Sequence, residues 1–367
     1  MMKYTFEDGC RAWLTYAHTQ PVPLQRMMDE FGSATAIYEQ CKRDGGKTLR
    51  RYLTERNVEK LLQRSARPAM HEMMVDMQRL EMQVVALRDP AYSPALRFIS
   101  DPPPFLFYRG DVSCMTGRCL AVIGSRAASP RAVTWCEELC RELSNHGVTI
   151  VSGLAAGIDT SAHEGSIHGT TPGIGIMACG LDVDYPASSR DLKRRLLEQG
   201  GLLLSEYPPG TTVRKSVFPV RNRIISGLCK GVVMMEARIT SGSFTTVHHA
   251  LDQGRDVYAW PGEPGSVWSE GAHQLLREGA RYFVTAEDLL EDLEWNDIAV
   301  KPEKREPIAA LTPDMQKILT ILYGGEKSLD ELAYESGLSI TALSTSLTIL
   351  QMSGLVRALP GKQYCVI

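Results

Sequence analysis

The chain has 367 residues, of which 44% are hydrophobic and 23% charged, and its formal net charge is −3. This is the composition of globular proteins, and the length is that of two or three domains, so a disordered or fibrous chain is excluded. No apolar run is long enough to cross a bilayer, and the N-terminal segment lacks the pattern of a signal peptide. The nine cysteines are scattered without a C-x-x-C pair. We therefore expect a cytoplasmic protein with no membrane contact, no disulfide framework and no metal site.

The first 65 residues predict a small helical domain. Apolar residues recur at helical spacing in RAWLTYAH, QRMMDEFG, ATAIYEQC and VEKLL, with turn signals between these segments. Residues 1–70 carry 12 Lys and Arg against 8 Asp and Glu, so this end of the chain is positive. A connector follows over residues 66–111, with a strand expected at Met82–Leu87 and a stiff Asp-Pro-Pro-Pro run at 101–104.

From Cys119 to about Leu293, apolar strands alternate with stretches of helical length. This pattern predicts a parallel sheet covered by helices on both faces, and therefore a Rossmann-like, doubly wound α/β domain. Ligands of such domains bind at the carboxyl ends of the strands. We place this extended domain at residues 66–294. The expected strands lie in CLAVIG, VTIVSG, GIGIMACG, GLLLSE, GVVMMEA, DVYAWPG and RYFVTA.

The C-terminal part predicts a polar linker at 295–310 and a winged-helix domain at 311–367. Its last helix, which would read a DNA groove, contains no Lys or Arg. Because phosphate affinity needs cations, we expect this domain to contact proteins rather than duplex DNA. The expected elements are helices at Leu311–Tyr323, Leu329–Ser336 and Ser339–Ser353 and a hairpin at Leu355–Ile367 around Pro360-Gly361.

The loop after the CLAVIG strand has features of a phosphate site. It contains Gly124, Ser125 and Arg126, and a helix is expected to begin with Ser129 as N-cap and Pro130 at N1. N–H groups at a helix start, together with an arginine, suit an anion, but a plain turn with a solvated arginine fits the pattern equally well. The loop is not G-x-G-x-x-G, so we expect no dinucleotide cofactor and no cofactor of another kind.

Two other strand-end loops could also approach a phosphate, through glycine backbone or hydroxyl groups. Tight packing of the glycines and ordinary Ser capping are the alternatives. Asp159 and His163 follow the loop with Gly153 and Gly157, and because they are four residues apart they could share a helix face. No third metal ligand is evident near them, so a capping Asp and a structural His are favoured over a metal pair. The candidate phosphate-binding residues are Gly153, Gly157, Ser241, Gly242, Ser243 and Thr245.

The most specific feature is the basic stretch between Glu206 and Gly227. Cations beside an aromatic ring are what sequence-tolerant binding of single strands needs, because cations neutralise phosphates and the ring stacks on a base. The alternative is that Phe218 belongs to the core and one arginine pairs with Glu206. The residues of this stretch that we expect to contact a strand are Lys215, Phe218, Arg221, Asn222 and Arg223, with Arg214 nearby.

Taken together, these loops resemble the DNA-processing protein A family, also called DprA or Smf. The resemblance covers about residues 85–285, with the motifs in order. The matching runs are IGSR (123–126), SGLAAGID (152–159), CGLDVDYP (179–186), SEYPPG (205–210), FPVRNRIISGL (218–228), MEARITSGSFTT (235–246) and GRDVYAWPG (254–262).

The resemblance implies an extended Rossmann domain, an N-terminal helical (SAM-like) domain and a C-terminal winged helix. It implies a non-enzymatic protein that binds and protects incoming single-stranded DNA during natural transformation, helps to load the RecA recombinase and forms a homodimer through the Rossmann-like domain. Arg126 and the group from Arg221 to Arg223 would line a basic pocket, with Phe218 stacking on a base. One departure is HTQPVPLQR (18–26), where relatives often carry a Gly-x-Gly hairpin that grips phosphates.

Two other functions are compatible with parts of the sequence. The central domain distantly resembles Rossmann-like nucleotide phosphoribohydrolases, but the loop Ser-Gly-Ser-Phe-Thr-Thr-Val-His-His lacks their glutamate, which leaves Glu236 and Asp159 as candidate acid/base groups. A transcription regulator that uses the winged helix is disfavoured by its missing cations. Adjacent His248 and His249 would face different directions, so a shared metal there is not expected.

Overall fold

The computed structural model describes residues 4–17, 21–295, 312–323, 325–352, 355–359 and 363–366, and the chain forms two compact units, 1–301 and 302–367. The expected linker, apart from its first residue, and the expected hairpin turn at Pro360-Gly361 lie outside the described residues. No helix in the described ranges is long and apolar enough to cross a membrane.

The N-terminal part of the first unit is a helical cluster, as predicted. The elements are α1 (Phe6–Thr15), α2 (Pro21–Phe31), α3 (Ala34–Asp44), a 3₁₀ turn (Leu49–Arg51), α4 (Glu55–Gln63) and α5 (Arg67–Arg79). Trp13, Ile37, Leu61 and Met77 are fully buried in the core of the cluster. Helix α5 was not predicted, and it lies where a connector was expected.

The central sheet of the first unit contains the seven predicted strands, and these are parallel to one another. The strands of the sheet are β1 (Gln83–Ala86), β2 (Phe105–Gly110), β3 (Arg118–Ile123), β4 (Val148–Ser152), β5 (Ile174–Ile176), β6 (Leu202–Ser205), β7 (Gly231–Met234), β8 (Asp256–Ala259) and β9 (Arg281–Tyr282). Their order is β1-β2-β6-β5-β4-β3-β7-β8-β9. The first two strands make the sheet mixed, which corrects the expectation of a wholly parallel one: β2 is antiparallel to both β1 and β6.

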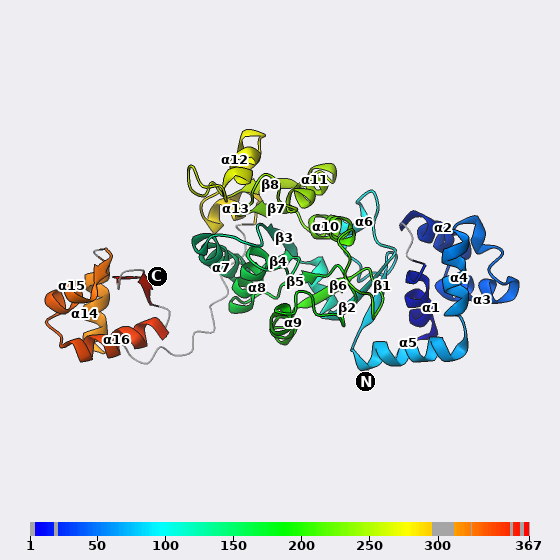
Figure 1. Ribbon diagram of the computed structural model, residues 1–367, viewed down its shortest axis with the longest axis horizontal. Helices are drawn as coiled ribbons and strands as arrows, with labels where there is room; N and C mark the ends of the chain where they lie inside the picture. The colour runs from blue at the N-terminus through cyan, green and yellow to red at the C-terminus, as the bar shows by residue number, and fades with distance from the viewer. Residues whose placement is uncertain are drawn as a thin grey trace. The chain divides into compact units, whose positions relative to one another are not determined.

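Helices cover both faces of this sheet, because successive side chains of the buried strands point to opposite sides. The helical elements are α6 (Pro94–Arg97), a 3₁₀ turn (Val112–Thr116), α7 (Pro130–Asn145), α8 (Ile158–His168), α9 (Ser189–Glu198), α10 (Val217–Leu228), α11 (Phe244–Asp252), α12 (Glu270–Arg277) and α13 (Ala286–Asp292). Leu120 and Val122 pack with α7, α8 and α13, whereas Ala121 and Ile123 pack with α10, α11 and α12. Figure 1 shows α7 and α10 on opposite sides of the strands.

The second unit is the predicted winged helix with its own apolar core, in which Ile318, Leu332 and Leu347 are buried. The elements are α14 (Pro313–Leu322), β10 (Lys327–Ser328), α15 (Leu329–Ser336), α16 (Ile340–Met352), β11 (Val356–Leu359) and β12 (Gln363–Val366). The three-stranded sheet of this unit has the order β10-β12-β11.

Candidate nucleic-acid interface

The strand order creates a switch point at β3, which has β4 on one side and β7 on the other. The loops that follow β3 and β7 therefore meet. The Ser243 hydroxyl donates a hydrogen bond to the Gly124 carbonyl (2.7 Å), and the Ser125 N–H donates to the Glu236 carbonyl (2.6 Å). In doubly wound sheets, ligands bind in the crevice at such a point.

The start of helix α7 is already occupied by an anionic group of the protein. Ser129 is the N-cap and Pro130 follows it, as predicted. The buried carboxylate of Glu236 accepts hydrogen bonds from the Ser129 N–H (2.8 Å) and hydroxyl (2.9 Å). This carboxylate takes the place in which an anion at the helix start was expected, so a phosphate bound by Arg126 would lie further out.

The loop after β4 is closed in the same way. Asp159 accepts hydrogen bonds from the N–H groups of Gly153 (3.1 Å) and Ala155 (3.3 Å), and burial raises the pKa of its carboxyl. Gly157 has φ of +77°, and a Cβ there would lie 2.3 Å from the Ser125 carbonyl oxygen. The glycines thus serve close packing of the two loops.

His163 lies beneath this loop and is fully buried. Its burial lowers the pKa of the imidazole to about 4, so the ring is neutral at pH 7. The described ranges contain no cluster of three or more His, Cys, Asp or Glu side chains that could hold a metal ion. Asp159 is not the cap of α8, whose N-cap is Gly157, and its carboxylate instead bonds the loop that precedes the helix. His163 is a core residue of the fold.

Arg221 points into the protein from the first turns of α10. Only 5% of it is exposed, and its Nη1 donates to the carbonyls of Gly153 (3.0 Å) and Ile176. Burial lowers the pKa of the guanidinium to about 10, which leaves it charged at pH 7. Asp159 is its nearby counter-charge. Arg221 therefore ties α10 to the carboxyl ends of β4 and β5.

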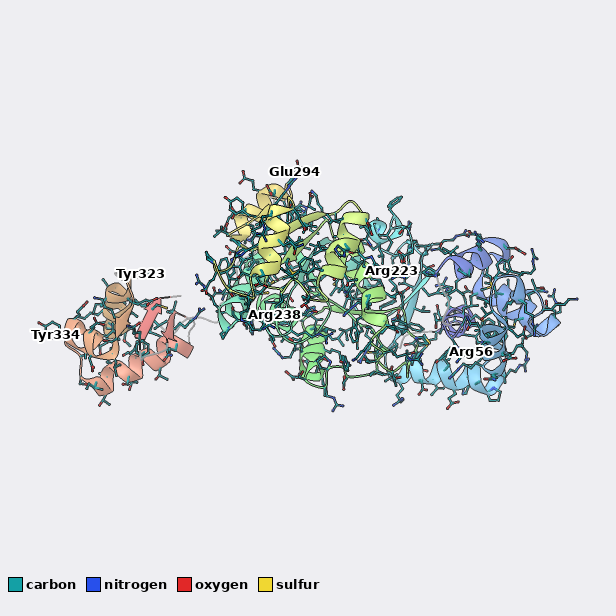
Figure 2. The ribbon with its side chains drawn as sticks, turned by 45° about the horizontal axis from the view of Figure 1, so that its top comes forward. Arg56, Arg223, Arg238, Glu294, Tyr323 and Tyr334 are labelled. Atoms are coloured by element: carbon teal, nitrogen blue, oxygen red, sulfur yellow. The ribbon has the colours of Figure 1, made fainter. Side chains whose placement is uncertain are left out.

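Arg223 is also buried, with 2% exposure, and it forms two ion pairs. Its Nε donates to Asp101 (2.8 Å) and its Nη2 donates to Glu206 (2.6 Å). The pairing with Glu206 is the alternative raised from the sequence. Figure 2 labels Arg223 beside the strands at the centre of the first unit. Of the three arginines that were expected to contact DNA, Arg221 and Arg223 thus bind protein groups.

The exposed part of the candidate interface is a cluster of one cation and two rings, which we call the stacking cluster: Arg126, Tyr185 and Phe218. The Arg126 guanidinium carbon lies 5.3 Å from the centre of the Phe218 ring, and the Tyr185 ring centre lies 5.7 Å from it. Phe218 is half-buried, while Tyr185 is 43% exposed. Phe218 is therefore supported from below and accessible from solvent.

Cations and polar groups surround the stacking cluster. Arg214 and Lys215 are exposed just before α10, and Asn222 is half-buried on that helix. Within the described residues, no salt bridge involves Arg126, Arg214 or Lys215. These free cations are the ones that a strand could neutralise.

Tyr185 was not identified as a site residue from the sequence. It lies in the run CGLDVDYP after β5, and Lys193 of α9 fixes this run by pairing with Asp184 (2.6 Å) and donating to the Val183 carbonyl (3.1 Å). The aromatic residue in that matched motif was the available signal. Its distance of about thirty positions from Phe218 concealed the contact.

The loop after β7 carries a second exposed cation, also not predicted. This residue is Arg238, which Figure 2 labels. Its guanidinium carbon lies 4.4 Å from the centre of the Trp268 ring. The hydroxyls of Ser241 and Ser243 bond to each other (3.0 Å), so they are engaged within the loop. Gly242 and Thr245 border the same turn, and a Cβ at Gly242 would meet open space.

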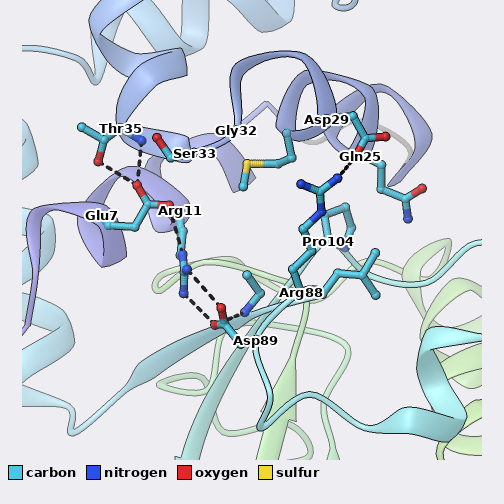
Figure 3. Close-up of a pocket in the computed structure, with 13 residues that line it drawn as sticks. Glu7, Arg11, Gln25, Asp29, Gly32, Ser33, Thr35, Arg88, Asp89 and Pro104 are labelled. Carbon is cyan, nitrogen blue, oxygen red and sulfur yellow. Dashed lines mark hydrogen bonds and ion pairs between the residues drawn. The ribbon is translucent and has the colours of Figure 1, made fainter.

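Two hollows lie beside the helical cluster. The smaller, about 430 Å³, is lined by α1, α2 and the segment after β1, and its charges are paired: Arg11 with Asp89 (2.7 Å), and Arg88 with Asp29 (Figure 3). The larger is a groove of about 1170 Å³ between α4, α5 and the segment that leads into α10. Its charged lining residues are Arg56, Lys60, Arg64, Glu72, Asp76, Arg79, Asp182, Glu206, Arg214 and Arg223.

The fold, together with the crevice at β3 where the strand order reverses, defines a doubly wound Rossmann-like protein with a winged-helix domain. Residues 83–294 match the family model of the DNA recombination-mediator protein A, and residues 302–362 match the DprA winged helix domain. The chain belongs to the DNA recombination-mediator protein A family, which confirms the resemblance drawn from the motifs.

Bacterial relatives and solved structures agree with this assignment. Protein Smf of Escherichia coli is 38% identical over 277 residues, which are 74% of each chain, and DNA processing protein DprA of Streptococcus pneumoniae is 40% identical over 57% of this chain and 74% of its own. The solved structure of the pneumococcal protein covers 79% of this chain and 99% of its own, with TM-score 0.64 and 30% identity. The structure of DNA processing protein A from Helicobacter pylori, described as showing a single-stranded DNA binding mode, covers 57% of this chain and 95% of its own, with TM-score 0.52 and 28% identity.

Proposed function

We propose that this protein binds single-stranded DNA without catalysing a reaction on it, and that the stacking cluster is where a base is held. The observation that carries the proposal is the Phe218 ring, which is partly exposed and flanked by Arg126, a cation without a salt bridge in the described residues. Stacking on an aromatic face is sequence-tolerant, and cations around it supply salt-dependent affinity. Lys215 precedes Phe218 and Asn222 follows it by one helical turn, so both would contact the strand next to this base.

Arg221 and Arg223 have a different place in this proposal from the one expected on sequence. Their guanidinium groups hold α10 against β4, β5 and Asp101, so they would position Phe218 rather than touch a phosphate. Gly124, Ser125, Gly153 and the other loop residues would likewise shape the crevice. In this arrangement the exposed cations would bind phosphates of the strand, and the buried arginines would hold Phe218 in position.

The Helicobacter pylori relative, whose structure is described as showing a single-stranded DNA binding mode, supports the assignment of ligand class. Family membership supports a role in DNA recombination and natural transformation. From that membership we also propose loading of RecA on the bound strand and homodimerisation through the Rossmann-like domain. Dimerisation would lengthen the strand path and raise avidity.

A nucleotide phosphoribohydrolase is not favoured. Glu236 and Asp159, its candidate acid/base groups, are both buried and accept hydrogen bonds from main-chain N–H groups. A general base must reach the substrate, and these carboxylates face their own loops.

The test is a fluorescence-anisotropy titration of labelled oligo-dT with the full chain at two salt concentrations, with duplex of equal length as competitor. We expect tight binding that weakens steeply with salt and is not displaced by the duplex. Absence of binding at low salt would contradict the proposed function, and a screen of nucleotides for hydrolysis would then follow.

A further inference from the structure

The larger groove collects positive charges from two parts of the first unit. Arg56 and Lys60 lie one turn apart on α4, and Arg214 lies on the segment before α10; all three line the groove. Figure 2 labels Arg56 on the helical cluster. In the described ranges these three side chains form no salt bridge. The pKa of Lys60 is lowered by burial and then by Arg56 and Arg214, as expected if the three cations face one another.

The acidic residues of the groove do not balance this charge, because most of them are already engaged. Asp76 pairs with Arg79 (3.1 Å), and Asp182 accepts a hydrogen bond from the Gly210 N–H (2.9 Å). Glu206 is paired with Arg223. Among the described residues, Glu72 is the one carboxylate of the groove lining that forms no ion pair or hydrogen bond. Asp182 and Glu72 keep their negative charges, but they are outnumbered by the lining cations that form no ion pair in the described residues, which are Arg56, Lys60, Arg64 and Arg214. Like charges that converge in excess are costly unless an anion joins them.

The groove adjoins the stacking cluster. Ser216, Val217 and Val220 line it, and they flank Phe218 on the first turn of α10. Exposed Lys215 lies between Phe218 and Arg214 in the chain. A strand with one base on Phe218 would therefore meet Lys215 and Arg214 next, and then the cations of α4.

Both walls of the groove are held in place by contacts of the helical cluster with the rest of the unit. Arg11 of α1 forms a two-point ion pair with Asp89, at 2.7 and 3.2 Å (Figure 3). The Gln25 side chain of α2 donates to the Pro102 carbonyl (2.8 Å), next to Asp101, which binds Arg223. The same proline run thus connects the helical cluster to α10.

We propose that this groove is a second subsite for the phosphodiester backbone of single-stranded DNA, formed by Arg56 and Lys60 of α4 together with Arg214. The subsite extends the strand path from Phe218 onto the N-terminal helical domain. It uses α4 instead of the glycine hairpin that the sequence lacks. This inference rests on the proposed function, because it extends the same strand.

The test compares the double variant Arg56→Ala/Lys60→Ala with a matched control, Lys42→Ala/Lys47→Ala. The control removes two exposed lysines of the helical cluster that do not line the groove. Binding of oligo-dT of roughly six and roughly twenty nucleotides is measured across a salt series, with lengths chosen to bracket single-strand site sizes. Circular dichroism melting checks that each variant is folded.

We expect the groove variant to bind the short strand like the wild type and the long strand roughly tenfold to thirtyfold more weakly at about 0.1 M salt. The salt slope should fall by about 1.4, because two fewer phosphates are neutralised. Arg214→Ala, on the opposite wall, should reduce the slope by about 0.7. The single variant Arg56→Ala serves as the test if the double variant of α4 does not fold.

Wild-type binding of the long strand by the groove variant, or an equal weakening in the control, would overturn the second subsite and leave the stacking cluster intact. Failure of the wild-type chain to bind either oligonucleotide would instead overturn the proposed function. The two failures are therefore distinguishable.

Discussion

Substitution of Phe218 by leucine separates stacking from charge. Leucine keeps an apolar side chain on α10 but removes the ring. Stacking of a base on an aromatic side chain is worth about 1–3 kcal/mol, so we expect binding of oligo-dT to weaken roughly 5- to 150-fold. The fold should lose little stability, since the ring is half-buried and its contact with Arg126 is a cation–π interaction of about 0.5–1 kcal/mol at an exposed site.

The salt dependence of binding distinguishes the members of the stacking cluster. Phe218→Leu should leave the slope of log affinity against log salt unchanged, because it removes no cation. Arg126→Ala should reduce the slope by about 0.7, because one fewer phosphate is neutralised. Anisotropy titrations across a series of salt concentrations measure both quantities. Wild-type affinity in Phe218→Leu would refute the stacking assignment, and an unchanged slope in Arg126→Ala would refute its role at a phosphate.

Three further outcomes follow from the buried groups and the second unit. Arg223→Met leaves Glu206 buried without its partner and should cost about 3 kcal/mol of unfolding free energy in urea melts, unlike Arg126→Ala, which should cost little. The pKa of His163 is about 4 in the folded state and has its ordinary value in the unfolded state, so the unfolded state binds the proton more readily as the pH falls. The free energy of unfolding should therefore fall by about 2 kcal/mol from about pH 7.5 to about pH 5, and His163→Asn should remove that part of the pH dependence. Equal pH dependence in both proteins would contradict the buried neutral ring. Fragment 302–367 should not retard duplex DNA at moderate salt in a gel-shift assay, because its last helix carries no cations.

Much of the fold could be predicted because burial on both faces of a parallel sheet leaves long apolar runs. The seven strands predicted between Cys119 and Leu293 are present, the strand expected at Met82–Leu87 is present as β1, and so are the three helices of the winged helix. Helix α5 was missed although Met70, Met73 and Met77 recur at helical spacing after Pro68, since the stretch was interpreted as a connector. Strand β2 follows the proline run and pairs antiparallel with β6, a partner some hundred positions away. Pairing of that kind has no local signal.

The strand-end loops of the candidate site were predicted from the sequence, whereas the orientation of its arginines was not. The strand-end loops meet as the fold class requires. Arg221 and Arg223 lie on either side of half-buried Asn222 on one helix. Nothing local indicates that Arg221 binds carbonyls at the ends of β4 and β5 and that Arg223 binds Asp101. Those partners lie tens of residues away, so burial of the two arginines is a tertiary result. The contacts of Tyr185 with Phe218 and of Trp268 with Arg238 are tertiary for the same reason.

The carboxylates of Glu236 and Asp159 fill the turns in which other doubly wound proteins cradle a nucleotide's phosphates. A domain built this way would bind a single free nucleotide weakly, because a carboxylate of the protein already occupies the position of the phosphate. Its affinity would have to accumulate along a polymer, through one stacked base and a succession of surface cations. Free nucleotides in a cell would then compete poorly with a strand only a few bases long. The affinity of the protein would depend on the length of the strand, whereas that of other doubly wound proteins depends on the identity of a small molecule.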